Sequence, residues 1–383
     1  MPEVCGRVCP QERLCEGACV LTKSRAPGSR AVAIGRLEAF VADARRKMDG
    51  DLSLPAIAPD TGKRVAVVGA GPAGLTVAEV LRREGHAVTV YDAWPHPGGI
   101  LLYGIPSFKL DRSLVTHKVA QLVQMGIRFI GNCRIGRDLP VAALLAQGYD
   151  AVFLGHGASA GVVPRLLGGG LTGVYQATDF LAGAYPPSTE QTFVRAAGQQ
   201  IVVIGGGDTA MDCARTAIRL GAAGVTCVYR RGTHEMPARP SEYHHALEEG
   251  VQFSFLADVV GFLSNGADRV QSVLCQRQEL GPPDHRGRPQ PRPLAGSEFT
   301  IPADLVVSAV GYHPDPQIGD GIPCLELADD GRVVVTGSGG TTSCPGVFAG
   351  GDCVRGADLV VTAVADGKRA AAAIHAYLNE GRS

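Results

Sequence analysis

The sequence has few aromatic residues and no long apolar run. Phe, Trp and Tyr make up 5% of its 383 residues, and there is a single Trp. No stretch approaches the roughly 18 consecutive apolar residues of a membrane-spanning helix, so no membrane span is expected. The N-terminus also lacks the apolar core of a signal peptide, which favours a cytoplasmic protein.

The sequence also lacks an excess of charge and any pair of cysteines in C-x-x-C spacing. Its 36 Lys and Arg balance 37 Asp and Glu, a net charge of −1, so nothing points to nucleic acid as a partner. Without C-x-x-C, no redox-active dithiol of that spacing is available. Low aromatic content with 51 glycines is typical of a parallel α/β fold, and the length suffices for two or three domains.

Two glycine-rich turns each follow a short apolar run and precede a helical pattern and a second strand. The run 64–68 leads into Gly69, Ala70, Gly71, Pro72, Ala73 and Gly74, and the run 201–204 leads into Gly205-Gly206-Gly207-Asp208-Thr209-Ala210. Glycine permits the tight turn and the close approach of a pyrophosphate, which then lies against a helix N-terminus. A single such turn could lack a ligand, but two in matching context predict two nucleotide sites.

The charge at the end of the second strand differs between the two units. Asp92 follows Gly69 by 23 residues and can hydrogen-bond a ribose hydroxyl, as FAD or NAD requires. Arg230 and Arg231 follow Gly205 by 25 and 26 residues and suit a 2′-phosphate. These charges could also be solvated surface groups. Together they favour FAD in the first unit and NADPH in the second.

The chain divides into an N-terminal segment and two related domains. Residues 1–50 form a Cys-rich helical segment, with a helix expected over 31–48, and residues 51–62 read as a linker. We expect two Rossmann-like α/β domains: a discontinuous FAD domain (63–183 plus 315–383) and an inserted NADPH domain (184–314). Buried strands at 149–155 and 303–311 extend the repeat to whole domains. Residues 281–296 read as a surface hairpin or loop.

Four of the eleven cysteines lie close together near the N-terminus, at Cys5, Cys9, Cys15 and Cys19. Thiolates at close spacing are what a 4Fe-4S cluster requires, whereas a zinc site more often has paired C-x2-C spacing. The alternative is reduced thiols in a partly ordered arm. The other seven cysteines read as small buried apolar residues: 133, 213, 227, 275, 324, 344 and 353.

This layout resembles the two-dinucleotide-binding-domain flavoproteins, and within them the glutamate synthase small-subunit family, whose module also occurs in dihydropyrimidine dehydrogenase. The resemblance covers essentially the whole chain. The segments that carry it are Cys5 to Cys19, Pro97-Gly98-Gly99-Ile100-Leu101-Leu102-Tyr103-Gly104-Ile105-Pro106, Gly205 to Asp212, Tyr229-Arg230-Arg231, and Gly350-Gly351-Asp352 through Gly367-Lys368.

The resemblance implies roles for matching residues. FAD would be held by the first glycine turn with Asp92, by the turn containing Gly99 and Leu101, by Lys109, by Gly351 and Asp352, and by the backbone at Val361 and Thr362, which would face the flavin. NADPH would be held by Gly205, Gly207, Asp208 and Thr209, by Arg230 and Arg231 with Arg239, and by the segment ending at Gly311.

The resemblance also bears on the cysteines. The complete family has a second, upstream Cys group, which this sequence lacks, and shares ligands between two clusters. Cys9 and Cys15 then match one cluster, together with Glu38, and Cys19 matches the other, while Cys5 has the weakest match. One cluster held by all four cysteines is the chemical alternative.

The function expected from this resemblance is that of an NADPH-dependent FAD oxidoreductase. Electrons would pass on to a partner subunit or iron–sulfur protein, and the chain could form a homo- or hetero-oligomer. Hydride transfer needs no side-chain acid or base, so no catalytic residue is assigned. Two alternatives remain: a catalytically idle flavin-binding assembly subunit, and a thioredoxin-reductase-like disulfide reductase, against which the missing C-x-x-C argues.

Overall fold

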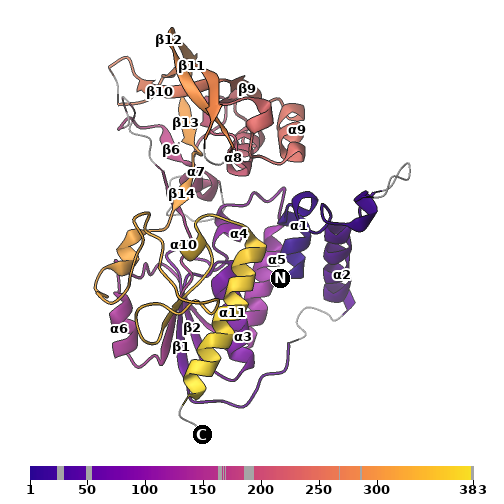
Figure 1. Ribbon diagram of the computed structural model, residues 1–383, viewed down its shortest axis with the longest axis vertical. Helices are drawn as coiled ribbons and strands as arrows, with labels where there is room; N and C mark the ends of the chain where they lie inside the picture. The colour runs from indigo at the N-terminus through magenta and orange to yellow at the C-terminus, as the bar shows by residue number, and fades with distance from the viewer. Residues whose placement is uncertain are drawn as a thin grey trace. The chain divides into compact units, whose positions relative to one another are not determined.

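The computed structural model describes residues 1–23, 30–48, 54–162, 166, 168, 170–184, 194–266, 268–284 and 287–380 (Figure 1). Its contacts divide the chain into two compact units. The first comprises Met1–Ala160 and His313–Ser383, and the second is Gly161–Tyr312. The chain passes between them within β5 (Ala160–Gly161) and between the residues of β14 (Tyr312–His313).

A parallel five-stranded sheet forms the centre of the first unit. Its strands lie in the order β15-β4-β1-β2-β3. They are β1 (Arg64–Val68), β2 (Ala87–Tyr91), β3 (Arg128–Ile130), β4 (Ala151–Leu154) and β15 (Val347–Ala349). In β1, Val65 and Val67 belong to the hydrophobic cluster of α3 and α11, whereas Ala66 and Val68 belong to the cluster on the opposite face. Such burial of both faces explains the continuous apolar run.

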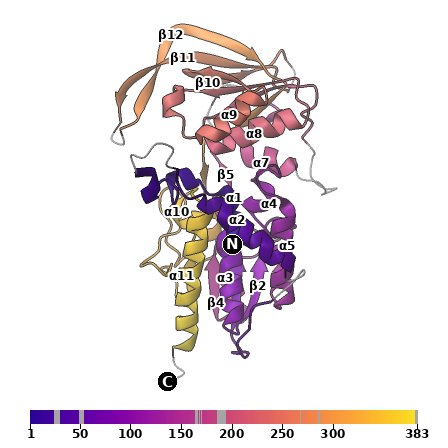
Figure 2. The ribbon, with the colours of Figure 1, turned by 90° about the vertical axis from the view of Figure 1, so that its right-hand side faces the viewer.

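Two long helices, α3 (Pro72–Arg83) and α11 (Val360–Asn379), pack side by side on one face of this sheet (Figures 1 and 2). Gly367 permits their close approach, because a Cβ there would lie 2.7 Å from the Ala73 carbonyl oxygen and 3.0 Å from the Thr76 Cβ. Other helical elements of the first unit are α6 (Val141–Ala146), η4 (Pro316–Gly319) and α10 (Asp352–Arg355). None of the helices within the described ranges has both the length and the apolarity to span a membrane.

The N-terminal segment packs onto the first unit through α1. The segment contains α1 (Pro2–Val8), η1 (Gln11–Arg13), η2 (Val20–Lys23) and α2 (Ile34–Met48). Its neighbours in the first unit are α4 (Ile100–Tyr103) and α5 (Arg112–Gln124). Val4 of α1 is buried in a cluster with Leu101, Leu110 and Leu114. The helix expected over 31–48 is found as α2. An ion pair of 2.6 Å between Arg7 and Asp43 links α2 to α1.

The second unit repeats the architecture of the first. Its parallel sheet has the order β6-β13-β7-β8-β9, with β6 (Val174–Gln176), β7 (Gln200–Ile204), β8 (Gly224–Tyr229), β9 (Gln252–Phe255) and β13 (Leu305–Ser308). The helices are α7 (Ala177–Gly183), α8 (Asp208–Arg219), η3 (Thr233–Glu235) and α9 (Pro240–Glu248). As β4 pairs with β1, so β13 pairs with β7, which confirms the predicted whole-domain repeat.

The boundary between the two domains differs from the predicted one at residues 183/184. Strand β6 and helix α7 lie within the second unit, because β6 pairs with β13 from Val306↔Val174 to Ser308↔Gln176. At the other end, the contacts place the boundary at 312/313, two residues before the predicted one. Residues 185–193, which follow α7, lie outside the described part of the chain, as do 51–53 of the predicted linker.

The second unit also carries an antiparallel sheet of three strands, β10 (Ala257–Leu263), β11 (Ser272–Pro283) and β12 (Pro289–Pro302). The segment 281–296, expected as a surface hairpin or loop, forms the connected ends of β11 and β12. Its residues 285 and 286 lie outside the described part. The hairpin pairs Leu280 with Pro291 and shifts its register before Pro283.

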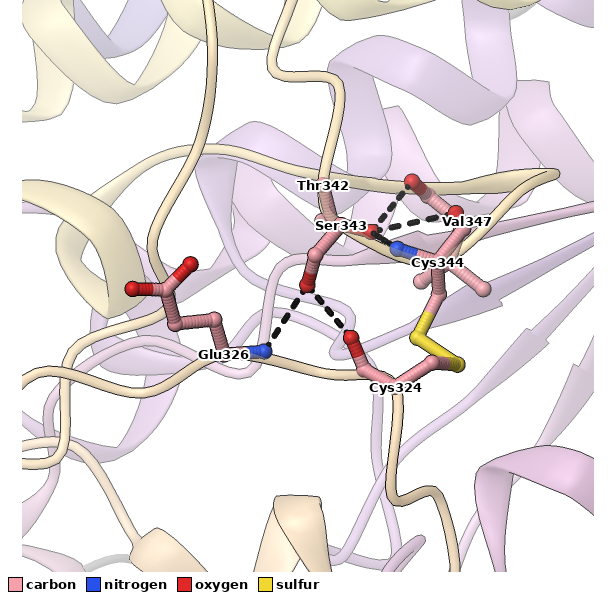
Figure 3. The surroundings of a disulfide bond; sticks show 6 residues. All are labelled: Cys324, Glu326, Thr342, Ser343, Cys344 and Val347. Atoms are coloured by element: carbon pink, nitrogen blue, oxygen red, sulfur yellow. Dashed lines mark hydrogen bonds between the residues drawn. A yellow bond between two sulfur atoms is a disulfide. The ribbon is translucent and has the colours of Figure 1, made fainter.

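A disulfide joins Cys324 to Cys344 in the first unit (Figure 3). This corrects the expectation that both are isolated buried thiols: Cys344 is buried, but Cys324 is exposed. The Ser343 hydroxyl donates to the Cys324 carbonyl at 2.5 Å and accepts from the Glu326 amide at 2.9 Å. The bond and these contacts tie together two loop segments that share no strand pairing.

Loss of the disulfide should destabilise the first unit. The double variant Cys324→Ser/Cys344→Ala removes a closure 20 residues long, for which chain entropy predicts about 3 kcal/mol. Urea unfolding should show this loss. Added reductant should lower the midpoint of the wild-type protein and leave that of the variant unchanged; equal sensitivity of both proteins would contradict the prediction.

Candidate dinucleotide-binding sites

The first glycine turn is tightly packed on one side and open on the other. Gly69 has φ +97°, and a Cβ there would lie 2.8 Å from the His156 Cα and in collision with the Gly155 carbonyl. At Gly71 a Cβ would meet nothing within 4 Å. Helix α3 starts immediately afterwards with no side-chain cap, so its free N–H groups lie at the open side. This is the geometry a pyrophosphate requires.

Asp92 lies at the end of β2 and makes backbone contacts. Its Oδ2 accepts from the Ala70 amide at 2.6 Å and its Oδ1 from the Trp94 amide at 2.8 Å. The side chain is buried, and this burial raises its pKa despite the two hydrogen bonds. Each oxygen keeps a second lone pair. Asp92 therefore fixes the glycine turn to β2, and its contact with a ribose remains a prediction.

The turn from Gly98 to Gly104 lies against the glycine turn. A Cβ on Gly99 would be 2.7 Å from the Gly71 Cα. Leu101 is 1% exposed and belongs to the cluster around Val4, whereas Ile100 is 53% exposed. The exposed side chain in this turn is thus that of Ile100, whereas Leu101 packs into the hydrophobic cluster and holds the turn in place. Lys109 lies six residues after α4 and is half-buried.

The predicted contacts from the C-terminal part come from two short stretches. Gly351 has φ +78°, and Asp352 begins α10. Helix α11 starts at Val360 without a side-chain cap, so the amides near Val361 and Thr362 are available to an acceptor. The Thr362 hydroxyl donates its proton to the Leu359 carbonyl at 2.7 Å, so the donors left for a ligand there are backbone amides.

Asp366 is a residue of this region that the sequence motifs did not indicate. It accepts from the Gly351 amide at 3.2 Å and from Arg355 at 2.6 Å, and it also pairs with Arg369. Burial would raise its pKa, but these hydrogen bonds lower it. Asp366 thus fixes the turn that precedes α10. Its partners lie 3, 11 and 15 residues away, and only the i,i+3 relation to Arg369 is visible as a local pattern.

Asp352 has no arginine partner among the described residues, and its compensation is a hydrogen bond from the Asp358 backbone amide. Burial raises its pKa to about 6, and the neighbouring Asp358 and Asp366 add to this effect. A half-buried carboxylate with this pKa is stabilised in its charged form by a ligand that donates a hydrogen bond to it.

The second glycine turn has the same design. Gly205 has φ +140°, and a Cβ there would collide with the Ala309 carbonyl, while the nearest atom to a Cβ on Gly207 is 4.0 Å away. The Asp208 carboxylate accepts from the Arg239 amide at 2.9 Å, and Thr209 hydrogen-bonds Tyr312. The structure therefore brings Gly205, Asp208 and Arg239 together with the segment that ends at Gly311.

The two arginines after β8 differ in their surroundings. Arg230 is exposed, whereas Arg231 is 8% exposed and its Nε donates to the Pro289 carbonyl at 2.8 Å. Of the pair, Arg230 is the more accessible to a 2′-phosphate, although it also interacts electrostatically with Asp258. The sequence motif alone could not separate them, because Pro289 lies 58 residues away.

The four N-terminal cysteines are only partly brought together. Cys5 and Cys9 are buried and hydrogen-bonded to each other, and Cys9 interacts electrostatically with Glu38 and Cys15. Cys15 is exposed, and backbone hydrogen bonds from Val32, Leu21 and Thr22 lower the pKa of Cys19. Among the described residues, no three His, Cys, Asp or Glu side chains are arranged to hold a metal ion. The cluster ligand set therefore remains a prediction.

Two family models match the chain. Residues 63–367 match the pyridine nucleotide-disulphide oxidoreductase family, and residues 1–50 match dihydropyrimidine dehydrogenase domain II, 4Fe-4S cluster. The glutamate synthase [NADPH] small chain of Escherichia coli is 43% identical over 99% of this chain and 81% of its own length. A putative glutamate synthase [NADPH] small chain of Cereibacter sphaeroides is 42% identical over 98% of this chain and 91% of its own.

Solved structures confirm the fold. The Mycobacterium tuberculosis protein FprA in complex with NADPH superposes with a TM-score of 0.67, covers 85% of this chain and 86% of its own, and is 22% identical. The predicted pair of related α/β domains is thus confirmed.

Two neighbouring aspartates should respond oppositely to substitution in the FAD-free protein. With a folded-state pKa near 6 against the usual value near 4, Asp352 costs about 3 kcal/mol above pH 6 and nothing well below pH 4. Asp352→Asn should therefore be more stable than wild type at pH 8 and equal to it at pH 4. Asp366, whose pKa is lowered, is the matched control: Asp366→Asn should be less stable than wild type at pH 8. Thermal unfolding measures both, and parallel shifts would contradict the assignment.

Proposed function

This chain belongs to the pyridine nucleotide-disulphide oxidoreductase family and, within it, to the group of glutamate synthase small chains, and we propose that it passes electrons from NADPH through FAD to a partner protein. It is an NADPH-dependent flavin oxidoreductase. The observation that carries the proposal is the pair of glycine turns that open onto helix N-termini, with Asp92 after one second strand and exposed Arg230 after the other.

In the proposed site for FAD, the backbone does most of the binding. Amides at the start of α3 would hold the pyrophosphate, and the uncapped start of α11 would offer N–H groups and a positive dipole end to a polar edge of the cofactor. Asp352 would accept a hydrogen bond from a cofactor hydroxyl. FAD, when bound, supplies the acceptor for a hydride.

No side chain is needed as an acid or base for hydride transfer. The two nitrogens of His156, next to the first glycine turn, are buried without hydrogen-bond partners, and burial lowers the pKa of this residue to about 4. The imidazole is therefore neutral near pH 7. We therefore propose no acid or base role for His156.

The partner would take electrons from an iron–sulfur centre in the N-terminal segment or directly from FAD. The match of residues 1–50 to a 4Fe-4S domain supports the first route, and so does the proximity of Cys9 to Cys15 and Glu38. The relatives' designation as small chains supports a larger partner subunit. A large glutamate synthase subunit or another iron–sulfur enzyme would fit this role.

An anaerobic titration followed by visible absorption tests the proposal. NADPH should bleach the flavin bands at lower concentration than NADH. Arg230→Ala should reduce the ratio of these two concentrations by about tenfold, because a charged hydrogen bond to NADPH is lost. A protein whose flavin stays oxidised under NADPH would instead be an idle assembly subunit. An iron assay on the same sample reports whether the cysteines hold a cluster.

The Cys324–Cys344 disulfide requires a separate control. The sequence has no C-x-x-C motif, but this disulfide is a pair of cysteines that could exchange with a substrate. NADPH-linked reduction of an external disulfide substrate should be negligible in the wild-type protein and unchanged in Cys324→Ser/Cys344→Ala. Robust reduction that disappears in this variant would favour the disulfide-reductase alternative.

A further inference from the structure

The end of the β11–β12 hairpin is fixed to the turn that follows β8. The Arg231 side chain reaches it through the 2.8 Å hydrogen bond to the Pro289 carbonyl. The Arg231 carbonyl accepts from the Leu256 amide at 3.1 Å, and the Leu256 carbonyl accepts from the Gln278 amide of β11 at 2.7 Å. Arg231 is therefore held on two sides by the antiparallel sheet, and its guanidinium positions the hairpin.

The residue next to Pro289 is Arg288, an exposed arginine at the hairpin end. Its Nη2 lies 3.5 Å from the Glu235 carbonyl oxygen, which also accepts from the Tyr229 hydroxyl at 2.9 Å. The Tyr229 ring lies against the second glycine turn, since a Cβ on Gly206 would be 2.6 Å from it. The Arg288 guanidinium thus lies at the end of η3, which follows the turn that starts with Arg230.

The backbone around Arg288 is fixed although its side chain is exposed. Its amide donates to the Asp284 carboxylate at 3.0 Å, and its carbonyl accepts from the Asp284 amide at 2.8 Å. The nearby Glu235 carboxylate accepts from the Gly232 amide at 3.1 Å. No carboxylate is recorded on the Arg288 guanidinium among the described residues, and its one recorded side-chain contact is with a carbonyl.

We propose that Arg288 is a specificity-determining residue that binds the ribose 2′-phosphate of the nucleotide together with Arg230, and that Arg231 positions it. The inference rests on the proposed NADPH site in the second unit. A 2′-phosphate carries nearly two negative charges and has several acceptor oxygens, which two guanidinium groups match better than one. The hairpin would then be part of the nucleotide site and recognise the group that distinguishes NADPH from NADH.

Binding of two small nucleotides to the FAD-loaded protein tests this role. Adenosine 2′,5′-bisphosphate carries the 2′-phosphate and 5′-AMP lacks it. Arg288→Ala should weaken the bisphosphate by roughly ten- to a hundredfold and leave 5′-AMP unchanged, as expected for a lost charge-assisted hydrogen bond. Arg288→Lys should retain part of the affinity. Isothermal titration calorimetry at fixed salt measures the affinity of each protein for both nucleotides.

The matched control is Arg292→Ala. Arg292 lies on the same hairpin and is exposed, but its side chain lies over Gly281. This variant should bind both nucleotides as the wild-type protein does. An equal loss in the two variants would indicate a general effect of positive charge and overturn the assignment to Arg288.

The positioning role of Arg231 has its own readout. Arg231→Ala should weaken the bisphosphate and also speed amide hydrogen exchange in β11 and β12, whereas Arg288→Ala should leave that exchange unchanged. If wild-type protein prefers the bisphosphate and Arg288→Ala retains that preference, the inference is wrong. If the wild-type protein itself shows no preference, the proposed use of NADPH fails instead.

Discussion

Direct backbone contact at the carboxyl edge of each sheet is the constraint on which both nucleotide sites depend. In the first unit a side chain on Gly69 would collide with the Gly155 carbonyl, and one on Gly74 would collide with the Gly69 carbonyl. The same holds for Gly205 and Ala309 in the second unit. This packing brings the strand ends and a helix N-terminus so close together that the free amides converge on a single open surface. The cofactor geometry is thus set by the main chain, and side chains adjust it.

The side chains of Asp92 after β2 and of Arg231 after β8 make hydrogen bonds within the fold, whether or not a ligand is bound. Asp92 uses both carboxylate oxygens on backbone amides, and Arg231 uses its guanidinium on a hairpin carbonyl. A sequence motif reports the residue type and position but not the partner that the fold has already supplied. For this reason the exposed Arg230 and the distant Arg288, rather than the adjacent arginine pair, best fit recognition of a phosphate.

The parts of the structure that could be predicted from the sequence are those encoded locally. Strand β1, the glycine turn and helix α3 follow from a buried apolar run and positions that only glycine tolerates, and α2 follows from its helical pattern. The boundary near residue 160 could not be predicted, because β6 has three half-buried residues and its strand identity depends on pairing with β13.

The remaining misses are long-range pairings. The Cys324–Cys344 disulfide, the contact of Asp366 with Gly351, and that of Arg231 with Pro289 join residues 20, 15 and 58 positions apart. Periodicity and motif spacing carry no signal at these separations. For the four N-terminal cysteines, close spacing in the sequence is not enough to predict a complete site. Cys5 lies beside Cys9, but no three possible metal ligands come together within the described residues.

Asp352 and Asp366 show how the fold leaves one polar group for a ligand. Both carboxylates are shielded from water near the turn at Gly351, and burial disfavours the charged form of each. Asp366 is compensated by Arg355, Arg369 and a backbone amide, so it remains ionised and holds the turn in place. Asp352 lacks an arginine partner among the described residues, and the one hydrogen bond from the Asp358 amide does not offset its burial, so its pKa is raised. A bound group that supplies a further donor there would favour the charged form, which supports the proposal that Asp352, rather than the ion-paired Asp366, accepts a hydrogen bond from the cofactor.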